Sequence, residues 1–173
     1  QQLIPDTDQV LKRKEELEWL KELVQSIAST ELIHIVAHRG FHSPMDRTDC
    51  RPLENSLSAY EAAWTNGIHL CECDVALTKD EKLVLCHDED FRRLALDPTA
   101  CGKRKVGDFS YRELLSLPLK NGTCRPPLLI DVLRSACAIG GPSQLIIEIK
   151  PGNVAAASAL ARLFLRHSAL MEK

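Results

Sequence analysis

The segment "IHLCECDVAL" (68–77) decides the fold, because it predicts a buried strand in which two kinds of reactive side chain alternate. Side chains two residues apart share one face of a strand, so Cys71 and Cys73 lie on one face and Glu72 and Asp74 on the other. A thiol pair would favour redox chemistry or zinc, whereas a carboxylate pair favours a hard cation bound by oxygen. Chemical partners elsewhere in the chain decide which pair carries the function.

Strands and helices alternate on both sides of this segment. The sequence predicts strands at 32–40, 68–77, 82–88 and 144–150, and helices at 54–66, 110–117, 126–141 and from Asn153 onward. Alternation of this kind predicts a parallel sheet covered by helices. With neighbours in chain order, the strand at 144–150 lies two strands away from the strand at 68–77.

The N-terminal part of the chain predicts one further helix. Residues 7–29 have apolar side chains near helical spacing, with Lys and Glu on the other side. Because this helix precedes the first strand, we interpret residues 1–30 as an added amphipathic helix that packs on the body. Residues 31–173 then form the main domain.

The composition indicates an ordinary globular domain. The 173 residues are 45% hydrophobic and 27% charged with a formal net charge of -2, which gives no reason to expect a nucleic-acid partner. No apolar run approaches the roughly 18 residues of a membrane span. Seven cysteines without a CxxC pair favour a reducing compartment, and we expect a cytoplasmic location. The chain begins at Gln1, so the sequence leaves open a removed upstream segment.

All four predicted strands end in polar residues. The pairs are His38 and Arg39, Glu72 and Asp74, His87 and Asp88, and Glu148 and Lys150. In barrels of parallel strands, functional residues lie at these C-terminal ends. Three converging acids, Glu72, Asp74 and Glu148, need a counter-charge, and Mg²⁺ or Ca²⁺ suits ligation by carboxylates alone. The alternative is that each acid pairs with a nearby Arg or Lys, for which Arg39 and Lys150 are available.

Two histidines at the same rim suit proton transfer near neutral pH. His38 and His87 would serve as general acid and base, and the cations of Arg39 and Lys150 would bind phosphate oxygens. The set as a whole describes a site for a phosphate ester. We interpret the arginines of "FRRL" (91–94) as parts of a solvated loop or as ion-pair partners of Asp88 or Asp90.

At these residues the sequence resembles the glycerophosphodiester phosphodiesterase family. The resemblance runs from about residue 35 to 151. The matching segments are "AHRG" (37–40), "RPLENSLSAYEAAWTNG" (51–67), "CECDVALTKDEKLVLCHD" (71–88) and "LIIEIKP" (145–151). Several spaced motifs in the same order are more specific than any single motif.

The resemblance implies a (β/α)8 TIM barrel that hydrolyses glycerophosphodiesters to an alcohol and glycerol phosphate. By matching motifs, the expected catalytic residues are His38 and His87, and the expected ligands of one divalent cation are Glu72, Asp74 and Glu148. The expected phosphate contacts are Arg39 and Lys150. Glu54 and Asn55 match the EN motif of the family and are expected to support the site from the first loop.

The chain departs from the family in extent. A full barrel has eight strands and about 250 residues, whereas this sequence predicts only about the first four β/α units, preceded by the extra helix. We therefore expect a fragment that is weakly active or inactive by itself. Its open edges would need the remainder of the barrel or self-association.

Two other functions are compatible with the sequence. One is a lipid phosphodiesterase of the lysophospholipase D or sphingomyelinase D type, and the other is a non-catalytic metal-binding half-barrel. The sequence leaves open the alcohol group of the substrate, the choice between Mg²⁺ and Ca²⁺, and which histidine is the acid.

Overall fold

The computed structural model describes residues 18, 21, 22, 25–27, 31, 34–42, 52–120, 125–151 and 153–173. The helix predicted at 7–29 lies mostly outside the described residues, so that helix and the division at residue 30 stay predictions. Within the described part of the chain, no helix is both long enough and apolar enough to cross a membrane.

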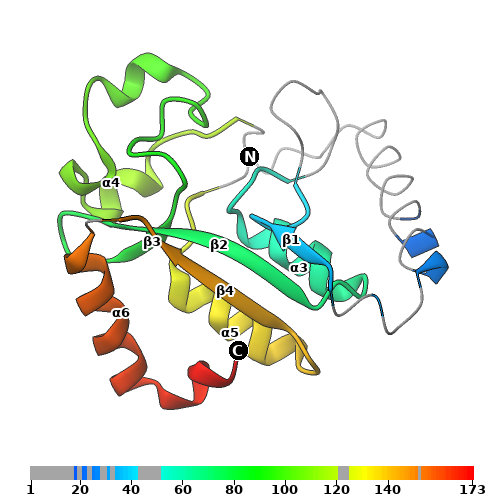
Figure 1. Cartoon of the computed structure of the whole chain (residues 1–173). Coiled ribbons are helices and arrows are strands. Elements are labelled where there is room, and N and C mark those ends of the chain that lie inside the picture. Colours follow the sequence, from blue (N-terminus) through cyan, green and yellow to red (C-terminus); the bar gives the residue numbers. More distant parts are fainter. Residues whose placement is uncertain are drawn as a thin grey trace.

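One long strand, β2 (Leu70–Leu77), organises the sheet (Figure 1). β1 (Val36–His38) and β4 (Gln144–Ile149) both pair with β2 in parallel. Because they pair with the same residues of β2, they lie on its opposite sides. β3 (Leu83–Leu85) pairs with the end of β2 and follows β1 along the same edge, since Val75 has partners in both β3 and β4.

The prediction of four successive parallel strands is wrong at β3, which runs antiparallel to β2. Residues 78–82 alone connect the two strands, and a parallel crossover needs about a dozen residues or more. Thr78 closes the turn, because its backbone N–H donates to Lys82 O at 2.9 Å and its Oγ1 accepts from Lys82 N at 2.9 Å. The described residues thus contain three parallel strands, and β4 is the direct neighbour of β2.

Helices cover the face of the sheet that carries the cysteines. α3 (Leu57–Thr65), α5 (Leu129–Ile139) and α6 (Val154–Arg166) build the main core together with β2. Cys71 and Cys73 are fully buried in that core, as the alternation along the strand predicts. Burial raises the pKa of Cys71 to about 12, so its thiol stays protonated and inert at neutral pH.

The helix starts follow local capping rules. Ser110 and Glu113 form a capping box at the start of α4 (Tyr111–Leu115), and Asn153 Oδ1 accepts from Ala156 N at 3.1 Å to begin α6. α3 begins after Ser56, later than predicted, because Asn55 adopts a left-handed backbone conformation with φ 54°. The described 3₁₀ helices are η1 (Pro98–Cys101), η2 (Val106–Asp108) and η3 (Ser168–Glu172).

The long segment between β3 and α5 has an apolar core of its own. Phe91, Phe109 and Leu114 are at most 2% exposed, and they pack with Val84 of β3. This second core fixes residues 87–93 beside the sheet, where they contribute to the site described below.

Gly40 follows β1 at a position where only glycine fits. Its φ is +79°, and a Cβ there would lie 2.8 Å from both the carbonyl carbon and the Cβ of Ala59 on α3. We expect Gly40→Ala to lower the free energy of unfolding by about 2 to 5 kcal/mol, the sum of a left-handed backbone penalty and overpacking. Urea denaturation measures the loss.

Gly141→Ala is the matched control for Gly40→Ala. Gly141 also has a positive φ, +58°, but a Cβ there meets no described atom within 4 Å. This variant should carry the backbone penalty alone, about 1 to 2 kcal/mol. Equal losses in the two variants would show that the close approach of Gly40 to α3 contributes nothing.

Candidate active site

The three predicted acids meet on one face of the sheet. Glu72, Asp74 and Glu148 each offer an oxygen atom, and these atoms lie within 4.8 Å of one another. Asp74 stands directly opposite Glu148 in the register of β2 and β4, and Glu72 precedes Asp74 on the same face. The predicted convergence is present, but it arises from direct pairing of two strands and not from strands two apart.

Glu72 is a partly buried carboxylate, and one of its two oxygen atoms lacks a partner among the described residues. Its Oε2 accepts from the backbone N–H of Arg39 at 3.2 Å and lies 3.7 Å from His38 Nε2. Its Oε1 is buried and has no hydrogen-bond partner among the described residues. Burial and the nearby Asp74 raise the pKa of Glu72 above its ordinary value.

Asp74 is fully buried, and its pKa shifts in the opposite direction to that of Glu72. Lys150 Nζ lies 2.8 Å from its Oδ1, although not in good hydrogen-bonding geometry. Arg39 Nε lies 3.2 Å from its Oδ2, to which Asn55 Nδ2 donates at 3.1 Å. Burial alone would raise the pKa of Asp74, but the contacts with Lys150 and Asn55 outweigh it and hold that pKa below the ordinary value.

The local cations neutralise only part of the triad. Lys150 Nζ donates to Glu148 Oε1 at 2.6 Å while it contacts Asp74, so the pairing alternative applies to those two acids. No Arg or Lys side chain forms an ion pair with Glu72 in the described residues. The unpartnered Glu72 Oε1 is the kind of atom that a cation with oxygen ligands satisfies, so the three acids fit a divalent cation.

Two strained turns bring Arg39 and Asn55 to Asp74. Both residues have positive φ, 57° and 54°, a conformation that asparagine tolerates and that arginine rarely adopts. Asn55 N donates to Arg39 O at 3.0 Å, which joins the turn after β1 to the loop before α3. Strained backbone of this kind clusters at functional sites.

The candidate site also contains a tyrosine of the main core. Tyr60 is fully buried, and its hydroxyl donates to Asn55 Oδ1 at 2.6 Å. The same oxygen accepts from Asp74 N at 3.3 Å, so Tyr60 fixes the orientation of the Asn55 amide. The short spacing between Asn55 and Tyr60 gave no signal of this contact.

The two histidines reach the rim by different routes. His38 ends β1, and its imidazole is 64% exposed beside Glu72. His87 follows β3, which runs back toward the rim, and the backbone N–H of Cys86 donates to Asp74 O at 3.1 Å. His87 therefore lies beside the acids because a hairpin returns to them, and not because a parallel strand ends there.

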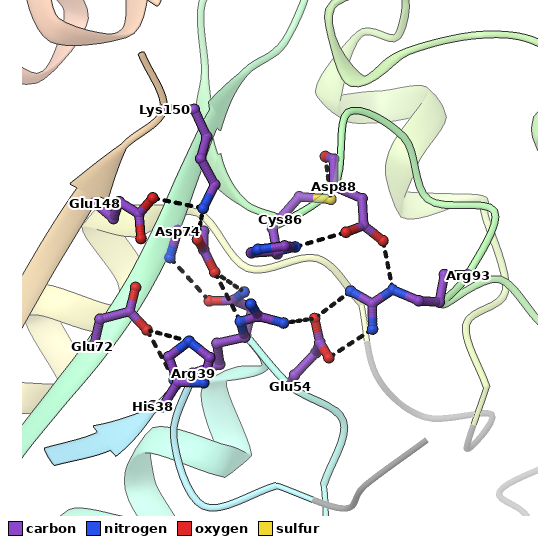
Figure 2. Close-up of polar contacts among 12 residues, drawn as sticks. His38, Arg39, Glu54, Glu72, Asp74, Cys86, Asp88, Arg93, Glu148 and Lys150 are labelled. Carbon is purple, nitrogen blue, oxygen red and sulfur yellow. Dashed lines mark hydrogen bonds and ion pairs between the residues drawn. The ribbon is translucent and has the colours of Figure 1, made fainter. Parts of the chain in front are cut away.

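A chain of side chains connects Asp74 to the segment after β3 (Figure 2). Arg39 Nη1 donates to Glu54 Oε1 at 3.2 Å, and Arg93 donates to both oxygens of Glu54. Arg93 Nε also donates to Asp88 Oδ2. Glu54 therefore belongs to this network of contacts. The Arg93–Asp88 ion pair is one of the alternatives that the sequence left open, whereas the contact of Arg93 with Glu54 was not predicted.

Comparison with known proteins agrees with this geometry. The model of the glycerophosphoryl diester phosphodiesterase family matches residues 38–158, which include every candidate site residue named above. A glycerophosphodiester phosphodiesterase of Bacillus altitudinis is 36% identical over 105 residues, covering 57% of this chain and 38% of that protein. One from Caldanaerobacter subterraneus is 35% identical over 127 residues, covering 69% of this chain and 46% of that protein.

Solved structures show the same relation. The crystal structure of a glycerophosphodiester phosphodiesterase from Thermotoga maritima has a TM-score of 0.55 and 32% identity, covering 75% of this chain and 49% of that one. An Oleispira antarctica phosphodiesterase in complex with sn-glycerol-3-phosphate has a TM-score of 0.60 at 23% identity, which supports the fold alone; the match covers 76% of this chain and 51% of that one. The chain spans less than half the length of the curated relatives it matches. Because the family model matches residues 38–158, which is more than half of the chain, the chain belongs to the glycerophosphoryl diester phosphodiesterase family.

Proposed function

We propose that the chain is the N-terminal part of a metal-dependent phosphodiesterase that hydrolyses glycerophosphodiesters to an alcohol and glycerol phosphate. The observation that carries the proposal is the acid triad, whose oxygen atoms lie within 4.8 Å of one another. His38 lies beside Glu72, and the residue before His87 is hydrogen-bonded to the backbone of Asp74. All of these residues lie inside the family match.

In this proposal Glu72, Asp74 and Glu148 hold one divalent cation, Mg²⁺ or Ca²⁺. Such an ion, when bound, neutralises charge on the phosphate and orients it. Lys150 is 37% exposed and bridges two of the acids, so its ammonium is also placed to contact a phosphate oxygen. Among the described residues, Arg39 contacts Glu54 through Nη1 and Asp74 through Nε, so Nη2 is the nitrogen placed for a phosphate contact.

His38 and His87 move the protons of the reaction. One imidazole accepts the proton of the attacking hydroxyl, and the other donates a proton to the leaving alcohol oxygen. The attacking hydroxyl belongs either to water or to the substrate itself, and in the second case a cyclic phosphate forms first and is then hydrolysed. Glu54 and Asn55 hold the site from the loop before α3 through their contacts with Arg39 and Asp74.

We further propose that additional β/α units complete the barrel, either in a longer chain or in a second copy. The face that carries the acids also exposes apolar side chains, with Val36 and Ile146 41% and 45% exposed. In a closed barrel this face is the packed interior. The loops of these additional units would select the alcohol group of the substrate. Residues 1–30 would form the added helix that precedes the barrel unit at 31–173.

A cytoplasmic location is part of the proposal. The thiols of Cys71, Cys73, Cys86, Cys101 and Cys137 are free among the described residues. Free thiols fit a reducing compartment.

A substrate panel tests the proposed function. The complete protein is assayed for release of glycerol phosphate from glycerophosphocholine and glycerophosphoethanolamine, with Mg²⁺, with Ca²⁺ and with a chelator. We expect release that needs the metal. Faster cleavage of lysophosphatidylcholine or sphingomyelin would replace the proposal with a lipid phosphodiesterase. Cation binding without any turnover would replace it with a non-catalytic metal-binding module.

A further inference from the structure

The guanidinium of Arg93 joins two carboxylates that come from different loops. Nη1 and Nη2 donate to the two oxygens of Glu54 at 2.8 and 2.6 Å, and Nε donates to Asp88. This paired arrangement is the most directional contact that arginine makes with a carboxylate. The adjacent Arg92 is 58% exposed and contacts Asp90, so two neighbouring arginines have separate partners.

Asp88 contacts both Arg93 and His87 and so connects these two side chains. Its Oδ2 accepts from Arg93, and its Oδ1 lies 2.7 Å from His87 Nδ1. Burial would raise the pKa of Asp88, but the contacts with Arg93 and His87 lower it below its ordinary value, so the group is a carboxylate at neutral pH. A carboxylate only accepts hydrogen bonds, so Nδ1 of His87 carries a proton and Nε2 is the nitrogen left for proton exchange with a substrate.

The other end of the guanidinium is fixed by a buried group. The Glu54 side chain is 5% exposed and also accepts from Arg39, whose Nε lies against Asp74. The sulfhydryl of Cys86 donates to the backbone oxygen of Asp88 at 3.3 Å and shapes the turn from which Asp88 extends (Figure 2). Arg93 therefore relates the position of Asp88 to that of the acid triad.

We propose that Arg93 is a positioning residue, which holds Asp88 so that Asp88 fixes the orientation and the protonated nitrogen of His87. The inference rests on the proposed phosphodiesterase function for its kinetic consequence, whereas the contact with His87 is independent of that function. Neither the family match nor the relatives' names assign a role to this residue.

Kinetics of the complete protein test the consequence. We expect Arg93→Gln to lower kcat for glycerophosphocholine by about 10- to 100-fold with little change in KM, because the variant misplaces His87 without removing a substrate contact. Arg93→Lys should restore part of kcat, since an ammonium keeps the charge and loses the paired geometry. Arg92→Gln, one residue away, should match the wild type.

Nitrogen-15 NMR of the His87 imidazole gives a readout that needs no turnover. We expect an Nδ1–H signal protected by Asp88 in the wild type and in Arg92→Gln, and its loss in Arg93→Gln. If Arg93→Gln does not fold, weakened protection in Arg93→Lys decides the question in the same way. Wild-type kcat and an unchanged His87 signal in the Arg93 variants would overturn the proposal.

The two proposals fail in different ways. A wild-type protein that cleaves no glycerophosphodiester, yet shows an Nδ1–H signal dependent on Arg93, would overturn the function and support the positioning role. A protein that cleaves glycerophosphodiesters at equal rates with and without Arg93 would support the function and overturn the positioning role.

Discussion

Replacing Glu72 with glutamine is expected to abolish divalent-cation binding and, with it, turnover in the complete protein. Glutamine keeps the shape of the side chain and removes the charge of the triad acid that forms no ion pair with an Arg or Lys side chain among the described residues. Loss of groups that merely support a metal ligand already costs 10- to 100-fold in affinity, so loss of a ligand should cost at least about 100-fold. Isothermal titration with Mg²⁺ and Ca²⁺ measures the affinity.

The same variant should behave differently when a chelator removes all divalent cations. Burial and the neighbouring Asp74 raise the pKa of Glu72 in the folded protein. The stability that such a group contributes is present below its ordinary pKa and is lost as the pH rises through the raised pKa. At neutral pH, Glu72→Gln without metal should therefore be at least as stable as the wild type, and this advantage should vanish in acid.

Cys73→Ala is the matched control, because Cys73 is the neighbour of Glu72 on the opposite face of β2. The variant should lose about 1 kcal/mol of stability from the smaller core side chain and keep its cation affinity. Loss of cation binding in the cysteine variant, with binding retained in Glu72→Gln, would contradict the assignment of the chemistry to the carboxylates.

Replacing His87 with alanine is expected to lower turnover by about 100- to 10,000-fold, the usual contribution of a general acid or base. Cation affinity should stay near that of the wild type, because His87 interacts with Asp88 and is not a member of the acid triad. Steady-state kinetics and titration on the same preparation separate the two effects.

His167→Ala controls for the removal of an imidazole. His167 is exposed and directly follows α6, which packs on the face of the sheet opposite the acid triad. Its replacement should change neither turnover nor cation affinity. An active His87→Ala enzyme would remove His87 from the proposed mechanism.

The sequence predicted the acid triad because its position depends on two short-range rules. Alternation along β2 separates Glu72 and Asp74 from the cysteines, and parallel strands bring their C-terminal ends to one rim. Both rules need only the strand assignments, so Glu148 was found without knowledge of the strand order. The orientation of β3 was mistaken because all strands were taken as parallel, although residues 78–82 alone connect β2 to β3 and are too few for a crossover.

The rest of the site depends on contacts that no local pattern encodes. Arg93 and Glu54 are 39 residues apart, and they meet only because the second core fixes the segment after β3 against the loop before α3. The left-handed turn at Asn55 shortens α3 at its start and frees Glu54 and Asn55 to face the sheet. The hydroxyl contact of Tyr60 with Asn55 depends on the same turn.

We propose that the strand-end carboxylates, and not the cysteines beside them, hold a divalent cation. A crystal of the complete protein grown with Mn²⁺, an anomalous scatterer that also prefers oxygen ligands, shows which of the two groups binds the ion. We predict one anomalous peak within bonding distance of Glu72, Asp74 and Glu148, with the Lys150 ammonium displaced from its bridge between two of them. A peak at the cysteines, or an ordered Lys150 bridge with no peak at the acids, would contradict the claim.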